Sequence, residues 1–193
     1  MNFILTNDQI EQFRIDGFLI VENLVDEKTI AQLHTRFDRL FQGVFETGTR
    51  PYVVNWQEGE SVPEVTRQIC NAWKSDRRVA ATVLREDLGR ALAYLGGWPG
   101  TRIVQDNVLS KPPSARTLGY HQDNAYCAWY TPREMLTCWI ALDDTSKNNG
   151  ALEFVRGSHR WHGQQVPVGA FHDPADYKKV MTVAAQQEEL TPE

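Results

Sequence analysis

The stretch from Arg102 to Gly163 reads RIVQDNVLSKPPSARTLGYHQDNAYCAWYTPREMLTCWIALDDTSKNNGALEFVRGSHRWHG. It contains short apolar runs that are separated by clusters of proline, glycine, asparagine and aspartate. Apolar runs bounded by such turn-forming residues are typical of β-strands. The pattern predicts strands over residues 101–109, 120–123, 135–142 and 151–155.

The residues before this stretch mainly predict helices. Thr6 and Gln9 have the spacing of a capping box, and Gly17 can end the helix that they begin. Asp26 is placed to cap a second helix, whose apolar residues recur at helical spacing. Gly43 can end this helix. Similar patterns predict helices over residues 63–74 and 76–95 and a short strand over residues 18–21.

Helices that precede strands predict the α+β class rather than alternating βαβ units. We expect one domain over residues 1–193, with a helical part over residues 1–98 and a β-rich part over residues 99–193. Four strands are too few to close a barrel, and the residues after Ala170 are polar and weakly patterned. We therefore expect the helices to pack on a partial barrel whose C-terminal strands are missing from this chain.

The composition narrows the class of protein. The chain has 193 residues, 41% of them hydrophobic, which fits a soluble globular domain, and its net charge of −5 argues against a nucleic-acid or anionic-membrane partner. No apolar run approaches the roughly 20 residues of a membrane span, and the N-terminus lacks the pattern of a signal peptide. Three cysteines without metal-type spacing favour a reducing compartment, so we expect a cytoplasmic protein.

His121 and Asp123 are separated by one residue within a predicted strand. Side chains alternate along a strand, so these two would point to the same side. Two histidines and one carboxylate on one face of Fe(II) form the site of many oxygenases and leave positions open for a co-substrate and oxygen. The alternative is that His121 and Asp123 are two polar residues of a loop, because the tripeptide His-x-Asp is common.

The neighbouring motifs favour the first interpretation. Five elements follow one another in a fixed order, and together they resemble the phytanoyl-CoA dioxygenase family of Fe(II)- and 2-oxoglutarate-dependent oxygenases. Their order and spacing make the resemblance specific, and residues 16–21 also resemble the family's first strand. The elements are Lys111-Pro112-Pro113, His121-Gln122-Asp123, Trp139-Ile140-Ala141-Leu142-Asp143, Asn148-Asn149-Gly150-Ala151-Leu152 and Gly157-Ser158-His159-Arg160.

The resemblance implies a double-stranded β-helix, or jelly roll, and a role for each matching residue. His121 and Asp123 match the first two iron ligands, whereas His159 matches a structural position. Contacts with 2-oxoglutarate are implied for Gln105, Asn107, Gln122 and Trp139. Gln105 and Asn107 could instead be ordinary polar residues of a half-buried strand, and Trp139 could belong to the core.

The implied reaction is the hydroxylation of an unactivated C–H bond in a small molecule, with Fe(II), 2-oxoglutarate and O2. Retention of Asp123 favours hydroxylation over the halogenating variants of the family. The family's distal histidine, and the arginine that follows it, have no match before Glu193, so we expect a truncated chain. The alternatives are a non-catalytic member that acts as a binding protein and a zinc hydrolase. The sequence indicates neither the substrate nor the oligomeric state.

Overall fold

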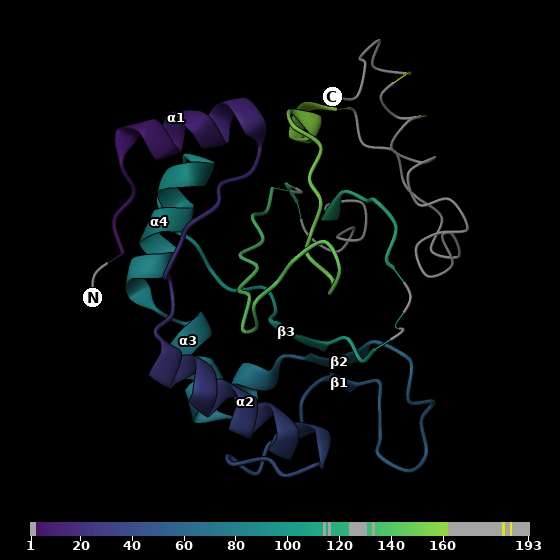
Figure 1. Ribbon diagram of the computed structural model, residues 1–193. Helices are drawn as coiled ribbons and strands as arrows, with labels where there is room; N and C mark the ends of the chain where they lie inside the picture. The colour runs from purple at the N-terminus through teal and green to yellow at the C-terminus, as the bar shows by residue number, and fades with distance from the viewer. Residues whose placement is uncertain are drawn as a thin grey trace. The chain divides into compact units, whose positions relative to one another are not determined.

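The computed structural model describes residues 3–113, 115, 117–123, 131, 132, 134–161, 183 and 186 (Figure 1). The chain divides into two compact units. Unit 1 comprises Met1–Ile4, Val21–Ala115 and Ile140–Asp144, and unit 2 comprises Leu5–Ile20, Arg116–Trp139 and Thr145–Glu193. Each unit therefore joins segments that are far apart in the sequence. The single domain over residues 1–193 stays a prediction.

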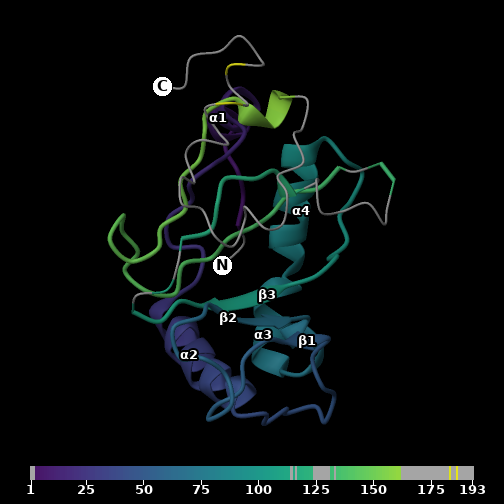
Figure 2. The same ribbon diagram turned by 90° about the vertical axis from the view of Figure 1, so that its right-hand side faces the viewer.

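Unit 1 combines helices with a small antiparallel sheet. The sheet has three strands in the order β1-β2-β3, and the helices α2 and α3 pack on one of its faces (Figure 2). Mixed helices and an antiparallel sheet agree with the α+β prediction at this coarse level. The elements of unit 1 are α2 (Glu27–Phe41), β1 (Val53–Val54), β2 (Arg67–Cys70), the 3-10 helix η1 (Ala72–Lys74), α3 (Arg77–Val83), α4 (Glu86–Gly96) and β3 (Asn107–Ser110).

The core of unit 1 lies between the sheet and these helices. Ile69 of β2 is paired with Val108 of β3, and both are buried on the face that meets Leu33 and Leu40 of α2. Leu33 and Leu40 are seven residues apart, so they lie on one side of the helix. Val79 of α3 completes this cluster, in which Ile69 and Leu40 are fully buried. Each such side chain contributes about 1.5–3 kcal/mol on burial.

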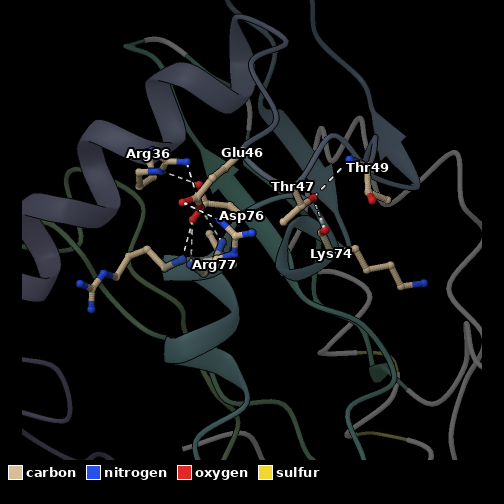
Figure 3. Close-up of polar contacts among 9 residues, drawn as sticks. Arg36, Glu46, Thr47, Thr49, Lys74, Asp76 and Arg77 are labelled. Atoms are coloured by element: carbon tan, nitrogen blue, oxygen red, sulfur yellow. Dashed lines mark hydrogen bonds and ion pairs between the residues drawn. The ribbon is translucent and has the colours of Figure 1, made fainter.

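A charged network joins α2 to α3 beside this core (Figure 3). Asp76 is fully buried and caps α3 by accepting hydrogen bonds from the backbone N–H groups of Arg78 (2.8 Å) and Val79 (3.1 Å). Arg36 of α2 binds the other oxygen of Asp76 at 2.5 Å and lies 3.2 Å from Glu46. A buried carboxylate is tolerated only where it is paired in this way, so Arg36 and Asp76 depend on each other.

Unit 2 contains α1 (Asn7–Asp16) and the 3-10 helix η3 (Ser158–Arg160). Thr6 and Gln9 form the predicted capping box at the start of α1, and Gly17 ends the helix with φ +82°. The turn before η3 contacts this end of the helix, because the backbone N–H of Gly157 donates to the carbonyl of Asp16 at 2.8 Å. The GSH motif, which consists of Gly157, Ser158 and His159, is thereby fixed to the C-terminus of α1.

Several predicted elements differ from the observed ones. The helix expected over residues 63–74 is wrong, because this segment contains β2 and η1, and the helix expected over residues 76–95 is divided into α3 and α4. Of the strand expected over residues 101–109, only the β3 portion is regular. Within the described residues, the expected strands over 18–21, 120–123, 135–142 and 151–155 have no regular strand pairing. Short apolar runs do not distinguish a helix from a strand, since a strand forms only where a neighbour pairs with its backbone.

In the part of the chain that the structure describes, no helix has both the length and the apolarity needed to cross a membrane.

Candidate metal centre

The side chains of His121 and Asp123 lie in direct contact in unit 2. Nε2 of His121 is 3.1 Å from Oδ1 of Asp123, and Nδ1 of His121 is 2.9 Å from the backbone oxygen of Gly119. The hydroxyl of Thr137 donates to Oδ2 of Asp123 at 2.5 Å. The side chains of His121 and Asp123 are 29% and 44% exposed, so both remain accessible to a ligand.

These contacts determine which atoms are available to a metal ion. A carbonyl oxygen only accepts hydrogen bonds, so the Gly119 carbonyl places a proton on Nδ1 of His121 and directs Nε2 toward Asp123. Two ligand atoms that bind one ion at right angles, with bonds of about 2.1 Å, are about 3.0 Å apart. The observed separation of 3.1 Å fits two adjacent ligands of one ion. The donor set, one imidazole and one carboxylate, also suits Fe(II).

The electrostatics of His121 and Asp123 are coupled. Burial lowers the pKa of His121, but its hydrogen bonds with Asp123 and Gly119 and the charge of Asp123 outweigh burial and raise the pKa above its usual value. The hydrogen bond with His121, assisted by Thr137, lowers the pKa of Asp123 although burial opposes it. Without a metal, the two groups therefore favour an ion pair in which a proton occupies the position between them.

The sequence did not predict the contact between Thr137 and Asp123. Thr137 lies 14 residues after Asp123, and no local pattern joins the two. The one signal in the sequence is that both residues lie in predicted consecutive strands. Thr137 holds Oδ2 of Asp123 and leaves Oδ1 facing His121, so it orients the carboxylate.

Gln122 points to a different partner from its two neighbours. Its side-chain amide donates to the backbone oxygen of Ser158 at 2.9 Å, so Gln122 connects the His121-Gln122-Asp123 segment to the GSH motif. His159 packs against Gly17, where a Cβ atom would lie 2.2 Å from Nδ1 of the imidazole. Burial, with the nearby charge of Arg160, lowers the pKa of His159. These contacts are of the structural kind expected for His159, and the co-substrate role of Gln122 stays a prediction.

The remaining predicted site residues are placed as follows. Gln105 donates to Oδ1 of Asn107 at 3.3 Å in unit 1, so these two side chains lie together. Trp139 belongs to unit 2 and is 42% exposed. Two further histidines of the sequence, His162 and His172, lie outside the described residues. Among the residues that are described, no group of three or more His, Cys, Asp or Glu side chains could hold a metal ion, so the third ligand is not found there.

Comparison with protein families places the chain in a class of oxygenases. The family model described as Phytanoyl-CoA dioxygenase (PhyH) matches residues 13–191. The chain belongs to this family, since the match covers most of its length. The motifs of residues 111–160 that resemble the family are all within the matched region.

The curated relatives are distant and are named as dioxygenases. The chain is 23% identical over 168 residues to the human peroxisomal phytanoyl-CoA dioxygenase, covering 82% of this chain and 49% of the relative. It is 24% identical over 163 residues to an ectoine dioxygenase of Bordetella bronchiseptica (81% and 50% covered). It is 24% identical over 155 residues to a probable alpha-ketoglutarate-dependent hypophosphite dioxygenase of Stutzerimonas stutzeri (79% and 53% covered). The chain spans about half the length of these relatives, and no solved structure matches it.

Proposed function

We propose that this chain is an Fe(II)- and 2-oxoglutarate-dependent dioxygenase that hydroxylates an unactivated C–H bond of a small molecule. The observation that supports it is the pairing of His121 Nε2 with Asp123 Oδ1 at 3.1 Å, in a chain of the phytanoyl-CoA dioxygenase family. The relative of Stutzerimonas stutzeri, a probable alpha-ketoglutarate-dependent hypophosphite dioxygenase, favours the same co-substrate.

In this proposal the chain's residues bind the metal ion and orient its ligand atoms. His121 and Asp123 supply two adjacent ligands through Nε2 and Oδ1, while Gly119 and Thr137 hold the other polar atoms of these side chains. Bound Fe(II) supplies the oxidation, in which one oxygen atom of O2 enters the substrate as hydroxyl and the other enters succinate as 2-oxoglutarate loses CO2. An aspartate ligand in place of a small residue favours hydroxylation over halogenation.

The finer assignments belong to the same proposal. Gln105, Asn107, Gln122 and Trp139 are proposed to contact 2-oxoglutarate, on the family resemblance of their positions. The third iron ligand, and the cation that binds the far carboxylate of 2-oxoglutarate, are proposed to come from outside the described residues. A jelly-roll barrel and a cytoplasmic location are proposed likewise, although the human relative is named peroxisomal.

The test is a visible spectrum of the chain with Fe(II) and 2-oxoglutarate without oxygen. A 2-oxoacid chelated to protein-bound Fe(II) produces a charge-transfer band, so the chain should develop this band and His121→Ala and Asp123→Ala should lose it. His34→Ala is the matched control, because His34 also lies beside a carboxylate, that of Asp143, at 3.6 Å. An unchanged band in His121→Ala would contradict the assignment of this ligand.

The second candidate is a non-catalytic member of the family that binds a small molecule. It is favoured by the lack of a third ligand among the described residues. The same titration distinguishes the two. A chain that binds 2-oxoglutarate without the band, or that binds Zn²⁺ in preference, would favour binding or hydrolytic chemistry over oxygenation.

A further inference from the structure

A pocket of about 700 Å³ lies between α2 and α3 within unit 1. Ala31 of α2 and Ala81 of α3 line it with small side chains, so neither helix fills the space. A volume of this size is typical of small-molecule sites, which span about 300–1,000 Å³. The other lining residues are all polar or charged: Lys28, Gln32, Thr35, Arg36, Glu46, Arg77 and Arg78. A lining with four cations and one carboxylate suits an anionic ligand.

Glu46 shows how the donors around this pocket bind an anion (Figure 3). Oε2 of Glu46 accepts a hydrogen bond from the backbone N–H of Arg77 at 2.9 Å and lies 3.2 Å from Nη2 of Arg36. Oε1 of Glu46 lies 3.6 Å from Nη1 of Arg77. Donors from both helices therefore converge on one carboxylate. Nη2 of Arg36 is buried, and it makes no hydrogen bond within the described part of the chain, so some donor capacity remains unused.

Lys28 and Arg78 supply positive charge that no close acidic side chain neutralises. Both residues are exposed, and among the described residues neither forms an ion pair with a carboxylate. The nearby acidic residue is Asp26, whose carboxylate already caps α2 by accepting from the Thr29 N–H at 2.7 Å. This hydrogen bonding lowers the pKa of Asp26, and the charges of Lys28 and Arg78 lower it further, so the three groups share one field. The charge of Lys28 and Arg78 therefore remains available to a ligand.

A phosphate group matches these cations better than a second carboxylate does. A phosphate monoester carries about −1.5 to −2 charges at pH 7 and accepts hydrogen bonds through three oxygens. Arginine binds phosphate through its planar fork, and lysine binds it as a point charge. The Arg77 side chain is 75% exposed, so it can turn from Glu46 toward a ligand. The net charge of −5 disfavours an extended anionic partner, so the pocket suits a small molecule.

We propose that the pocket between α2 and α3 binds a phosphorylated small molecule. Lys28, Arg77 and Arg78 hold its phosphate group, and Gln32 and Thr35 lie beside a polar remainder of the ligand. The site is formed within unit 1 and uses no residue of the candidate metal centre, so it goes beyond the proposed function.

The test is a titration of the metal-free chain with ribose 5-phosphate at constant ionic strength, followed by NMR of the backbone amides. The amide signals of residues 28–35 and 77–81 should shift until the site is saturated. Ribose without the phosphate should produce no such shift. Inorganic phosphate should bind more weakly than ribose 5-phosphate, because it leaves most of the pocket empty.

Charge variants at the pocket should change the affinity in opposite directions. Arg78→Gln should weaken the binding of ribose 5-phosphate by about fivefold, as expected for one lost charged contact at an exposed site. Arg39→Gln is the matched control, because Arg39 is an exposed arginine of α2 that does not line the pocket. It should leave the affinity within about twofold. Glu46→Gln should tighten binding, since it removes a competing negative charge and keeps an oxygen for the Arg77 N–H.

Two further variants guard against misfolding and identify the ligand. Lys28→Gln, on the other helix, should weaken binding as Arg78→Gln does, so the result does not depend on the folding of one variant. Ala81→Leu fills part of the pocket from an exposed position, so it should weaken the binding of ribose 5-phosphate more than that of inorganic phosphate.

Two outcomes would overturn the proposal. One is equal affinity in Lys28→Gln, Arg78→Gln and Arg39→Gln, which would show that the cations of the pocket do not bind the ligand. The other is equal binding of ribose 5-phosphate and inorganic phosphate with no change in Ala81→Leu. That result would mean that the chain attracts a phosphate ion only and holds no larger molecule in the pocket.

Discussion

The two units are stabilised by different kinds of contact. The buried hydrophobic residues of the described chain all belong to unit 1: Leu33, Leu40, Trp56, Ile69, Cys70, Ala72, Val79, Leu88, Ala91, Ala93 and Val108. In the described part of unit 2 the charged side chain of Asp16 is buried instead, with 4% exposure. The aromatic pair of that unit, Phe18 with Phe154, leaves Phe154 57% exposed.

This difference determines how each unit should respond to mutation. Apolar burial is non-directional and tolerates small changes of shape, whereas a hydrogen bond is lost when one atom is replaced. The residues around His121 and Asp123 belong to the second kind, since Gly119 and Thr137 hold them through single hydrogen bonds. The candidate metal centre should therefore be sensitive to substitutions that leave the core of unit 1 unaffected.

The largest effect is expected at Asp76, a fully buried carboxylate of unit 1. Asp76→Ala removes the cap of α3 and leaves the Arg36 guanidinium, 19% exposed, without its buried partner, so the free energy of unfolding should fall by about 4 kcal/mol. Asp26→Ala is the control, since Asp26 caps α2 on the surface and should cost about 1 kcal/mol. Urea denaturation measures both. Equal losses would show that the Arg36–Asp76 pair adds nothing beyond the cap.

A smaller loss is expected where α1 meets η3 in unit 2. Gly17→Ala places a Cβ atom 2.2 Å from His159 Nδ1 at a residue with φ +82°, so the combined strain and displacement should cost about 3 kcal/mol. Gly43→Ala has a similar φ of +78° and no neighbour within 4 Å, so it should cost about 1 kcal/mol. The difference between these losses in thermal denaturation isolates the contact with His159. No difference would mean that unit 2 does not depend on that contact.

At the candidate metal centre the effect should appear in binding rather than in folding. Thr137→Val removes the hydroxyl that orients Asp123, so Fe(II) affinity should fall about tenfold, or about 1.4 kcal/mol, with a melting temperature close to that of the unmodified chain. Thr137→Ser retains the hydroxyl and should bind as the unmodified chain does. Isothermal titration under anaerobic conditions measures the affinities. Equal affinity in Thr137→Val would show that Asp123 needs no such support.

The smallest effect concerns acid stability in unit 1. Hydrogen bonds from Arg85, assisted by Phe3, hold the pKa of Asp87 well below its usual range. A depressed carboxyl pKa contributes stability that is present above the unfolded value of about 4 and is lost as the pH falls through the folded value. Asp87→Asn should therefore flatten the loss of stability below about pH 4, measured by urea denaturation.

Asp106 provides the contrast, because burial raises its pKa despite the hydrogen bond from the Trp73 N–H. A raised carboxyl pKa lowers stability above the folded value, and this cost is relieved as the pH falls toward the unfolded value. Asp106→Asn should therefore steepen the loss of stability as the pH falls toward about 4, just above the range in which Asp87→Asn flattens it. A change in the same direction for both variants would contradict the opposite environments of these carboxylates.

The sequence by itself determined the features that depend on near neighbours along the chain. The capping box of Thr6 and Gln9, the cap at Asp26 and the stop at Gly17 all formed as predicted. The family could also be recognised, because its motifs are short and occur in a fixed order, and the family match confirms it. The contact of His121 with Asp123 needs only a spacing of two residues, so it forms although these residues are not in a regular strand.

The tertiary structure decided everything that depends on a distant partner. The segment that contains Ile69 has an apolar pattern compatible with a helix, and it becomes β2 because β3 pairs with it. The convergence of Gln68 and Cys70 on Asn107 follows from the register of that pairing, and the support of Asp123 by Thr137 likewise joins residues that no local pattern connects. Helix caps and i, i+2 contacts are set by backbone geometry within one turn, whereas strand register and polar contacts across tens of residues are selected by the free energy of the whole packed unit.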